Sequence, residues 1–387
     1  MARLRIPPPP GRLRLLSVGP IPPEWGGRLR GGVTRFHASL LDEFRTRPWR
    51  HRIDPIGVLI PPPQRVKRWR ADRRAPLPVL MQPKDGRPRR FTELLLDRVD
   101  PDVVLLNNLA AFNGARFARI RAERAPDLPT VAIIHEWRAI RAKHDTERGR
   151  RYLEAARGGL DSVDAVVFPS EHTRSLGRDE LGLGYPEIAE VIPNPLQPAF
   201  AAEEVRTDRE RRGIAFVGSF NRRKNPGVVL EAAAQLGEIE VVMQGRGPLK
   251  DDLRERTEAL GLTSRVEFPP YVEPPGHVDA VIGVMERAEL VCLPSLSESF
   301  GLVQIEALAA GAPVVGFGPT LREIRDRVGI DVGEPIDDPT PDAVAAAIEA
   351  VRSRVWDRAR LRRAALSEFS VRSVARRYAR LLREVRR

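Results

Sequence analysis

Residues 290–316 read LVCLPSLSESFGLVQIEALAAGAPVVG and predict a strand, a loop, a helix and a second strand in that order. The apolar run at 290–293 is typical of a buried strand, and Pro313 opens the next one. We expect the helix to begin near Phe300 and to end at Gly311, because glycine suits the left-handed position that follows a helix. Such a strand-helix-strand unit is typical of a parallel sheet covered by helices.

The same alternation runs along most of the chain. Runs rich in Val, Ile and Leu predict parallel strands buried on both faces at 13–18, 103–106, 131–134, 165–168, 214–217, 240–243, 266–268, 290–293 and 313–317. Helical patterns lie between them at 33–44, 228–236, 249–260 and 300–310. The sequence therefore predicts an α/β protein with doubly wound sheets.

A proline-rich segment, IPNPLQPAF at 192–200, predicts a linker, because its three prolines cannot continue a helix or a central strand. We therefore expect two Rossmann-like domains that face each other across a cleft. Their predicted bounds are 12–195 and 196–369, with a disordered basic lead at 1–11 and a final helix at 370–387 that crosses back to the first domain. Ligands of such sheets bind at the carboxyl ends of the strands.

The composition excludes several classes of protein. The chain has 387 residues, of which 42% are hydrophobic and 30% charged, so it can form large cores. Its only cysteine, Cys292, excludes a disulfide framework and a cysteine zinc site, and six scattered histidines do not suggest a metal centre. No apolar run is long enough to span a membrane, and arginines interrupt the N-terminal stretch, so we expect a cytoplasmic protein without a signal peptide.

The net charge of +12 is unevenly distributed along the chain. Residues 1–100 carry a balance of +13 and residues 340–387 one of +8, whereas residues 101–339 carry −9. Two interpretations remain open: an arginine-rich composition with solvated faces, or a basic surface that binds an acidic molecule or an anionic membrane. Nucleic-acid binders usually concentrate basic charge on one continuous face with matching aromatic residues, so no nucleic acid is expected.

The predicted helix near Phe300 offers a binding site for phosphate, because the first turn of a helix has unpaired N–H groups and a positive dipole end. Glu298 precedes this turn and Glu306 lies within the helix. Carboxylates in these places can accept hydrogen bonds from sugar hydroxyls. Each glutamate alone is better explained as a capping acid or a surface residue, but Glu306 lies in an otherwise apolar segment.

The spacing of these glutamates resembles the Glu-x7-Glu signature of the retaining nucleotide-sugar glycosyltransferases of family 4, which have the two-domain GT-B fold. The resemblance extends from about Leu13 to Leu382. It implies that Glu298 contacts hydroxyls of the transferred sugar and that Glu306 holds the ribose of the donor. It also implies that the donor contacts the loop and the backbone amides at Ser299, Phe300, Gly301, Leu302 and Val303.

A basic loop, GSFNRRKN at 218–225, follows the predicted strand at 214–217. It resembles the family's Gly-Arg-Leu-x-x-x-Lys-Gly loop, whose basic residues grip the donor diphosphate. Lys224 matches the lysine, whereas Ser219 stands where the family has arginine. Arg222 or Arg223 would supply the missing guanidinium, which is a strong fork for phosphate. The alternative is a solvated basic turn.

Two further segments of the second half resemble donor-binding elements. The turn QGRGP at 244–248 resembles the family's Gly-x-Gly-Pro turn, in which Gly245 would line the nucleotide, although a tight turn between strand and helix also explains it. The segment VEFPPYV at 266–272 resembles the strand and turn that lie against the base, with Pro270 in place of the usual glycine.

The first half supplies weaker candidates. Gly31 and Gly32 precede a helical pattern, and in the family the second glycine touches the donor phosphate; a flexible surface loop is the alternative. His135 follows a buried strand, where the family frequently has a histidine near the sugar, although a lone histidine there is more often a satisfied polar residue. Glu136 and Arg138 are expected to contact the acceptor only.

The resemblance implies a retaining glycosyltransferase that moves a sugar from a nucleoside diphosphate to a glycan, lipid-linked or small-molecule acceptor. Its expected catalytic residues are His135, Glu298 and Lys224. No cofactor and no metal are expected, and the acidic pair Asp100 and Asp102 precedes a strand and is interpreted as a turn. The alternatives are a GT-B nucleotide-sugar epimerase, a sugar phosphorylase, or a catalytically silent module that binds sugar or nucleic acid.

The predicted acceptor domain also contains tryptophans among arginines, a mixture that suits a lipid headgroup interface. The residues concerned are Trp49, Arg50, Arg68 and Trp69, and the basic helix at 371–385 would extend the same surface. We therefore expect an anionic or membrane-borne acceptor and peripheral contact with the inner face of the plasma membrane. Arginines that merely solvate the surface are the alternative.

Overall fold

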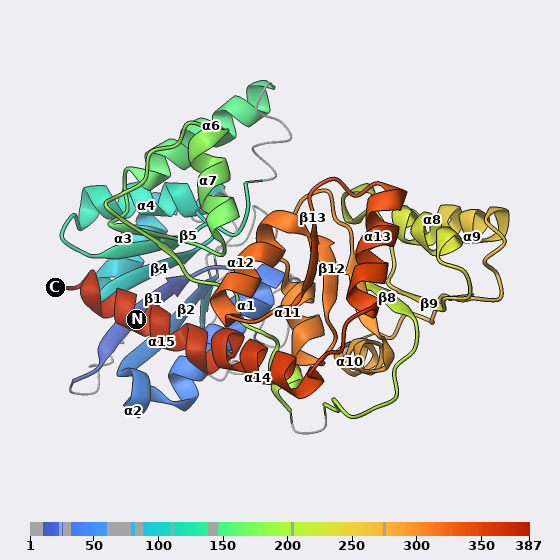
Figure 1. Cartoon of the computed structure of the whole chain (residues 1–387). Helices are drawn as coiled ribbons and strands as arrows, with labels where there is room; N and C mark the ends of the chain where they lie inside the picture. Colours follow the sequence, from blue (N-terminus) through green and yellow to red (C-terminus); the bar gives the residue numbers. More distant parts are fainter. Residues whose placement is uncertain are drawn as a thin grey trace. The chain divides into compact units, whose positions relative to one another are not determined.

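The computed structural model describes residues 11–22, 25, 32–59, 79–81, 88–109, 112–137, 146–202, 205–273 and 276–387. The chain forms two compact units, shown in Figure 1. Unit 1 comprises Met1–Asn194 and Val371–Arg387, and unit 2 comprises Pro195–Ser370. The chain passes between the units within the proline-rich segment at 192–200 and again at Val371. Apart from Gly11, the basic lead predicted at 1–11 lies outside the described residues.

Unit 1 is built on a parallel sheet, whose described strands have the order β3-β2-β1-β4-β5-β6-β7. The strands are β1 (Leu13–Val18), β2 (Ile53–Leu59), β3 (Val79–Met81), β4 (Val103–Asn107), β5 (Thr130–Ile133), β6 (Ala165–Phe168) and β7 (Ile188–Val191). The central strand β1 is buried along its whole length. Leu13 and Leu15 belong to one hydrophobic cluster, and Leu16 and Val18 belong to another, so the sheet has a core on each face.

Helices cover both faces of this sheet. They are α1 (Gly32–Thr46), α2 (Pro48–His51), α3 (Pro88–Val99), α4 (Phe112–Arg124), α6 (Glu147–Leu160), α7 (Glu171–Asp179) and α15 (Val371–Glu384). The last helix packs on α1, where the rings of Phe36 and Tyr378 lie 5.8 Å apart. Its buried side chains, which include Val374, Tyr378 and Leu382, recur at helical spacing, and its remaining positions are rich in arginine. The C-terminal segment therefore completes the core of unit 1.

Unit 2 repeats the architecture with the strand order β10-β9-β8-β11-β12-β13, again parallel. Its strands are β8 (Ile214–Val217), β9 (Val241–Gln244), β10 (Val266–Glu267), β11 (Leu290–Leu293), β12 (Val314–Phe317) and β13 (Gly333–Ile336). The direction of the winding reverses between β8 and β11. In doubly wound sheets this switch point is where ligands bind, beyond the carboxyl ends of the strands.

The helices of unit 2 pack in two layers. One hydrophobic cluster includes residues of α10 (His277–Arg287), α11 (Leu302–Ala309), α12 (Gly318–Val328) and α14 (Arg358–Phe369). The other includes residues of α8 (Gly227–Gln235), α9 (Lys250–Ala259) and α13 (Pro341–Arg352). Two short 3-10 helices, η2 (Pro198–Ala201) and η3 (Arg222–Lys224), lie in the connections.

All nine predicted strands and the four helices predicted between them are present, with ends that differ by at most two residues, and the predicted final helix is α15. The strands β2, β3, β7 and β13 were not predicted from the sequence. In β2 the apolar pattern is interrupted by Pro55, which lacks an N–H group for the ladder. The described part of β3 pairs only with Gly57–Leu59 of β2. Pro55 therefore faces no described residue of β3, and its missing N–H group leaves no gap in the pairing of these two strands.

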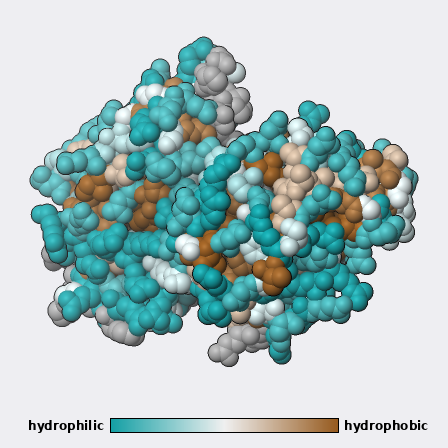
Figure 2. Space-filling view, viewed as in Figure 1, coloured by the Kyte–Doolittle hydropathy of each residue, from teal (hydrophilic) through white to brown (hydrophobic). Residues whose placement is uncertain are grey.

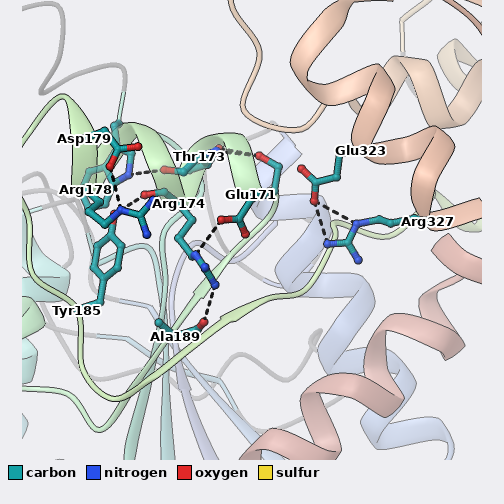
Figure 3. A network of polar contacts seen from close by, with 11 residues as sticks. Glu171, Thr173, Arg174, Arg178, Asp179, Tyr185, Ala189, Glu323 and Arg327 are labelled. Carbon is teal, nitrogen blue, oxygen red and sulfur yellow. Dashed lines mark hydrogen bonds and ion pairs between the residues drawn. The ribbon is translucent and has the colours of Figure 1, made fainter.

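A polar network ties α7 to the sheet of unit 1 (Figure 3). Arg174 pairs with Glu171 on the same helix at 3.1 Å and donates to the carbonyl of Ala189 on β7 at 3.3 Å. The Tyr185 hydroxyl donates to the carbonyl of Arg174 at 2.6 Å. The network fixes α7, which in turn supports the segment that follows β5.

The visible face of the molecule in Figure 2 is largely hydrophilic, and its hydrophobic residues form separate patches. The region that α15 occupies in Figure 1 is mostly hydrophilic in this view. Within the described residues, no helix combines the length and the hydrophobicity that crossing a membrane requires.

Candidate functional site

Three loops meet at the carboxyl ends of β8, β9 and β11, at the switch point of unit 2. The basic loop at 218–225 and the loop at 244–248 are joined by backbone hydrogen bonds. Gly218 donates to the carbonyl of Gln244 at 3.0 Å, and Phe220 donates to the carbonyl of Arg246 at 2.9 Å. The loop at 294–301 joins the basic loop through Leu296, whose N–H donates to the carbonyl of Arg223 at 2.8 Å.

The basic loop owes its shape to Asn221. Its side-chain oxygen accepts a hydrogen bond from the N–H of Lys224 at 3.0 Å and so caps η3. Asn225 then adopts the left-handed conformation with φ 51°, which ends the turn before α8. This compact turn directs Arg223 and Lys224 toward the loop after β11, whereas Arg222 is exposed.

Arg223 and Lys224 both bind Glu298. Lys224 Nζ lies 2.5 Å from one carboxylate oxygen, and Arg223 Nη1 lies 3.2 Å from the other. The same guanidinium nitrogen of Arg223 donates to the carbonyl of Ser297 at 2.7 Å. Residues predicted from two separate motifs, the basic loop and the pair of glutamates, therefore form one cluster. Ser219, the residue at the family's arginine position, is exposed beside them.

The charge state of Glu298 follows from two opposing effects. The side chain is 11% exposed, and its burial alone raises the pKa of the carboxyl group. The positive charges of Lys224 and Arg223 and the hydrogen bond from Lys224 outweigh burial, so the pKa lies below its ordinary value. Glu298 is therefore an anion at neutral pH. Its contacts suit a residue that accepts hydrogen bonds and neutralises cations.

Gly245 lets the two loops approach closely. A Cβ atom at this position would lie 1.9 Å from the carbonyl oxygen of Gly218, which is far inside van der Waals contact. The requirement for glycine is therefore explained by packing between the loops.

The helix that follows the third loop is α11. Gly301 is the N-cap residue, with φ 85°, a conformation that L side chains rarely adopt, and as a glycine it supplies no side-chain cap. The helix ends at Ala309 with Ala310 as its C-cap, and the predicted glycine, Gly311, follows in the left-handed conformation with φ 77°. The amides of Leu302 and Val303 open the helix, and Phe300 is buried against Phe369 with ring centroids 5.8 Å apart. The first turn thus has the geometry of an anion site.

Glu306 is buried within α11 and is not the exposed helix residue that the alternative interpretation requires. Its side chain is 6% exposed, and Gln197 Nε2 donates to its carboxylate at 2.6 Å. A buried carboxylate is costly unless it is hydrogen-bonded, and Gln197 supplies one such bond. Gln197 lies in the proline-rich segment and was not anticipated from the sequence.

Three arginines that the sequence analysis did not single out bind the opposite end of α11. Arg362 donates to the carbonyl of Ala309 at 2.7 Å, Arg211 to that of Ala310 at 2.8 Å, and Arg358 to that of Gly311 at 3.2 Å. Burial, followed by repulsion from Arg358, lowers the pKa of Arg211 to about 10. Cations at this end stabilise the helix dipole. These arginines are distant in sequence, so no local pattern could have revealed them.

A cavity of about 250 Å³ lies beside β9 and β10. Its lining includes Pro269 and Pro270, from the turn predicted to lie against a base, and Gln244 at the end of β9. The Gln244 side chain is 2% exposed, and its Nε2 has no hydrogen-bond partner among the described residues. The turn was predicted from the sequence, whereas no role was predicted for Gln244, the first residue of the QGRGP segment. A nearby stacking contact places the Arg246 guanidinium 4.1 Å from the centre of the Tyr271 ring.

In unit 1, His135 lies two residues beyond β5 and is buried. Its Nε2 lies 2.6 Å from Oδ1 of Asn107, the last residue of β4, and its ring packs edge-on against Phe36 at 5.0 Å. Burial, with a smaller effect from His37, lowers the pKa of His135 to about 3. Trp137 anchors the same segment by donating to the carbonyl of Thr173 on α7 at 3.0 Å.

The remaining candidates of unit 1 are less defined. Gly32 is the first residue of α1, and Glu136 is partly buried between His135 and Trp137. Gly31 and Arg138 lie outside the described residues, as do Arg68, Trp69 and the side chain of Trp49. The described ranges contain no group of three or more His, Cys, Asp or Glu residues arranged to hold a metal ion. The carboxylate of Asp102 accepts a hydrogen bond from the N–H of Arg14 at 2.7 Å. Asp102 lies in the bend just before β4.

Comparison with known families covers both halves of the chain. The family described as Glycosyltransferase Family 4 matches residues 30–200, and the family described as Glycosyl transferases group 1 matches residues 200–367. The chain belongs to the family 4 glycosyltransferases. The family predicted from the two glutamates is therefore confirmed.

Curated relatives of this family 4 chain include two proteins named D-inositol 3-phosphate glycosyltransferase. The one from Mycolicibacterium gilvum (strain PYR-GCK) is 31% identical over 241 residues, which cover 58% of this chain and 53% of the relative. The one from Mycobacterium bovis (strain BCG / Pasteur 1173P2) is 36% identical over 170 residues, which cover 40% of this chain and 34% of the relative. The chain thus spans about half or less of the curated relatives that it matches.

Solved structures share the fold over nearly the whole chain. HepE (Alr3699) of Anabaena, solved in complex with UDP and glucose, has a TM-score of 0.67 at 17% identity, covering 96% of this chain and 100% of that one. The lipopolysaccharide outer core galactosyltransferase WaaB, in its apo form, has a TM-score of 0.71 at 13% identity with the same coverage. The GT-B fold predicted from the sequence is confirmed.

Proposed function

We propose that the protein transfers a glycosyl group from a nucleoside diphosphate sugar to an acceptor, with retention of configuration at the anomeric carbon. The observation that carries this proposal is the cluster of Arg223, Lys224 and Glu298 beside the first turn of α11. Two cations and a helix N-terminus attract a diphosphate, and a carboxylate accepts hydrogen bonds from sugar hydroxyls. Family membership supports the same activity.

Each part of the donor has a complementary group in unit 2. The diphosphate would bind Lys224, Arg223 and the amides at the start of α11. The sugar hydroxyls would bind Glu298, and the ribose would bind the buried carboxylate of Glu306. The base would lie against the cavity lined by Pro270 and Gln244.

The chemistry would depend on positioning and on charge stabilisation of the leaving group. In the proposed reaction the acceptor attacks the anomeric carbon from the face that the diphosphate leaves, and the departing diphosphate takes the proton of the acceptor hydroxyl. Lys224, Arg223 and the dipole of α11 would neutralise the developing charge without a metal ion. The arginines at the far end of α11 hold that helix in place and support this role.

The donor and acceptor classes are inferred with the relatives in view. HepE was solved with UDP and glucose, which supports a UDP-sugar as the first donor to test. Two curated relatives are named for D-inositol 3-phosphate, a small anionic acceptor. We therefore propose an acceptor that carries phosphate or another anionic group. Unit 1, which contains the basic N-terminal part of the chain, would bind it.

Unit 1 also presents a cluster of arginines that supports membrane docking. Burial lowers the pKa of Arg50 on α2, and the positive charges of Arg372, Arg47 and Arg376 lower it further. Arg47 precedes α2, and Arg372 and Arg376 lie on α15. These four cations are therefore near one another. Glu43 is the carboxylate that opposes them. We propose that this surface binds anionic lipid on the inner face of the plasma membrane, where the surface potential is negative.

The activity is tested by incubating the protein with a panel of UDP- and GDP-sugars and candidate phosphorylated acceptors. Donors are first ranked by thermal stabilisation, because a ligand at 100 times its Kd adds about 2.7 kcal/mol of stability. Acceptor-dependent release of the nucleoside diphosphate, with an α-configured product from an α-configured donor, is the expected result. An inverted product, an epimerised donor or turnover that requires inorganic phosphate would contradict the proposal.

A further inference from the structure

Two buried histidines at the carboxyl edge of the unit 1 sheet differ in how their nitrogens are satisfied. Burial lowers the pKa of His37 to about 4 and that of His135 to about 3, so both rings are neutral at physiological pH. A neutral imidazole carries one N–H and one acceptor nitrogen. The hydrogen-bond partners of each ring therefore decide which nitrogen is left for a ligand.

The ring of His37 is fully used within the protein. Its Nδ1 lies 3.0 Å from the carbonyl oxygen of Pro20, which can only accept, so Nδ1 carries the proton. Its Nε2 then accepts from the hydroxyl of Ser17 at 2.6 Å. With both nitrogens satisfied and no exposed surface, His37 has a structural role.

His135 has the opposite arrangement. Its Nε2 lies 2.6 Å from Asn107 Oδ1, which accepts but cannot donate, so the proton resides on Nε2. Nδ1 is then an acceptor and has no hydrogen bond to any described residue. The amide nitrogen of Asn107 likewise has no partner within the described part of the chain, and its side chain is 2% exposed. The pair therefore leaves one acceptor and one donor unused.

This pair lies where ligands of α/β proteins bind. Asn107 is the last residue of β4 and His135 follows β5, which pairs with β4 in parallel (Figure 1). Buried polar groups without partners are rare in folded proteins and call for an explanation. A hydroxyl group both donates and accepts, so it complements the open Nδ1 of His135 and the open amide of Asn107. A sugar or polyol supplies such hydroxyls.

We propose that Asn107 is a positioning residue that holds His135 in its Nε2–H tautomer, so that Nδ1 accepts a hydrogen bond from a substrate hydroxyl. The proposal deepens the proposed function and rests on it for the identity of the substrate. The bond between the two side chains fixes both the tautomer and the ring orientation before substrate arrives, as other buried partners of histidine do. Asn107 itself need not touch the reacting atoms.

The direct test is nitrogen NMR of the wild-type protein labelled with ¹⁵N-histidine, which assigns the tautomer of each ring without any substrate. We expect His135 as the Nε2–H form and His37 as the Nδ1–H form. In Asn107→Leu, which keeps the branched four-atom shape of the side chain but removes the acceptor, we expect His135 to lose its preference for Nε2–H. Finding wild-type His135 as the Nδ1–H form would overturn the proposal.

Activity provides the second readout. Asn107→Leu should lower kcat/KM about tenfold, the value of one neutral hydrogen bond, at every pH. Asn107→Asp restores the acceptor, but its negative charge raises the pKa of His135, whose other titratable neighbour is His37. The kcat/KM of Asn107→Asp should therefore return toward the wild-type value at high pH and fall as the pH is lowered. Ser17→Ala is the matched control, because it disturbs His37 in the same cluster and should leave His135 unchanged.

The outcomes separate the two proposals. Identical, pH-independent losses in Asn107→Leu and Asn107→Asp, with an unchanged His135 tautomer, would show that Asn107 is merely structural. If the wild-type protein transferred no sugar, the proposed function would fail, and the tautomer measurement would still decide whether Asn107 positions His135.

Discussion

Lys224 Nζ lies 2.5 Å from Glu298 Oε1, so a cation suited to a diphosphate is held by an internal carboxylate. Arg223 binds the other oxygen of the same carboxylate at 3.2 Å. Glu298 therefore orients both cations and offsets their charge before a donor arrives. In the proposed function a donor diphosphate would share these cations with Glu298, and its sugar hydroxyls would bind the carboxylate.

This arrangement predicts opposite effects on binding and turnover when Glu298 is replaced. Glu298→Ala should lower the rate of transfer, because the sugar loses a charged acceptor worth roughly 1.5–3 kcal/mol. It should not weaken binding of the free nucleoside diphosphate, since Lys224 and Arg223 lose a competing anion. Calorimetry and initial rates measure the two effects. Weaker nucleotide binding together with an unchanged rate would contradict the assignment.

Glu306 should behave differently, because it is expected to hold the ribose. Glu306→Ala should weaken both nucleoside diphosphate and nucleotide-sugar binding by roughly 10- to 150-fold, the equivalent of about 1.5–3 kcal/mol. Gln197→Ala is the control, since it removes the internal partner of Glu306 and keeps the carboxylate. If Glu306→Ala bound nucleotide like the wild-type protein, the carboxylate would serve only to bind Gln197.

The glycine at 245 provides a test of the loop geometry. Gly245→Ala introduces a Cβ atom 1.9 Å from the carbonyl oxygen of Gly218, so the loops must separate. We expect a fall in thermal stability and weaker donor binding, because the basic loop moves with Gly218. Gly184→Ala, where no atom lies within 4 Å of the new Cβ, should be neutral. Equal melting temperatures for the two variants would exclude tight packing between these loops.

The strand pattern was predictable because strands buried on both faces form continuous apolar runs. The strand β2 escaped prediction, since Pro55 and Gly57 interrupt its pattern and the short β3 makes that proline tolerable. The edge strands β7 and β13 carry Glu190 and Pro335, so their apolar runs are too short to recognise. Strands at the edge of a sheet are therefore harder to predict from their hydrophobic pattern than central strands.

The site was predictable only in part. Glu298, Lys224 and Arg223 lie in motifs that resemble a known family, but their mutual contacts depend on how β8 and β11 pair. Gln197, Asn107 and the arginines at the end of α11 belong to no motif that resembles the family. Gln244 opens the QGRGP turn, but no role was predicted for its side chain. Their roles arise from burial, which leaves the Gln244 Nε2 without a partner among the described residues and gives Glu306 a hydrogen bond from Gln197. No single sequence shows which polar residues a fold will bury.

Two of the buried histidines, His37 and His135, predict acid sensitivity. Both folded-state pKa values, about 4 for His37 and about 3 for His135, lie below the unfolded value of 6.5. The unfolded chain therefore binds more protons below pH 6.5, and stability falls as the pH drops toward the folded-state values. At pH 5 each histidine should reduce the free energy of unfolding by about 2 kcal/mol relative to pH 7.5.

Urea unfolding at pH 7.5, 6 and 5 measures this dependence. His37→Asn should be less stable at pH 7.5, because it loses the bonds to Ser17 and Pro20, but it should lose less stability on acidification. Most carboxyl groups titrate below pH 5, so they remain ionised over this pH range. A free energy of unfolding that is constant between pH 7.5 and 5 would mean that both rings are solvated.

The arginine cluster of unit 1 predicts binding to anionic vesicles. Arg372 and Arg376 are exposed on α15 beside Arg50, and each arginine near such a surface contributes about 1 kcal/mol. The double variant Arg372→Glu with Arg376→Glu should lower the fraction that sediments with vesicles containing phosphatidylserine by about tenfold or more. Added salt should have the same effect on the wild-type protein, because it screens exposed charge.

A matched control reverses the same number of charges in unit 2. Arg360→Glu with Arg363→Glu changes two exposed arginines of α14 and should leave vesicle binding close to the wild-type level. A general attraction between a basic protein and an anionic surface would instead weaken equally in both double variants. Equal losses would therefore refute a specific docking face on α2 and α15. Equal, salt-insensitive recovery of the wild-type protein in the supernatant with neutral and anionic vesicles would leave a soluble anionic acceptor as the ligand of unit 1.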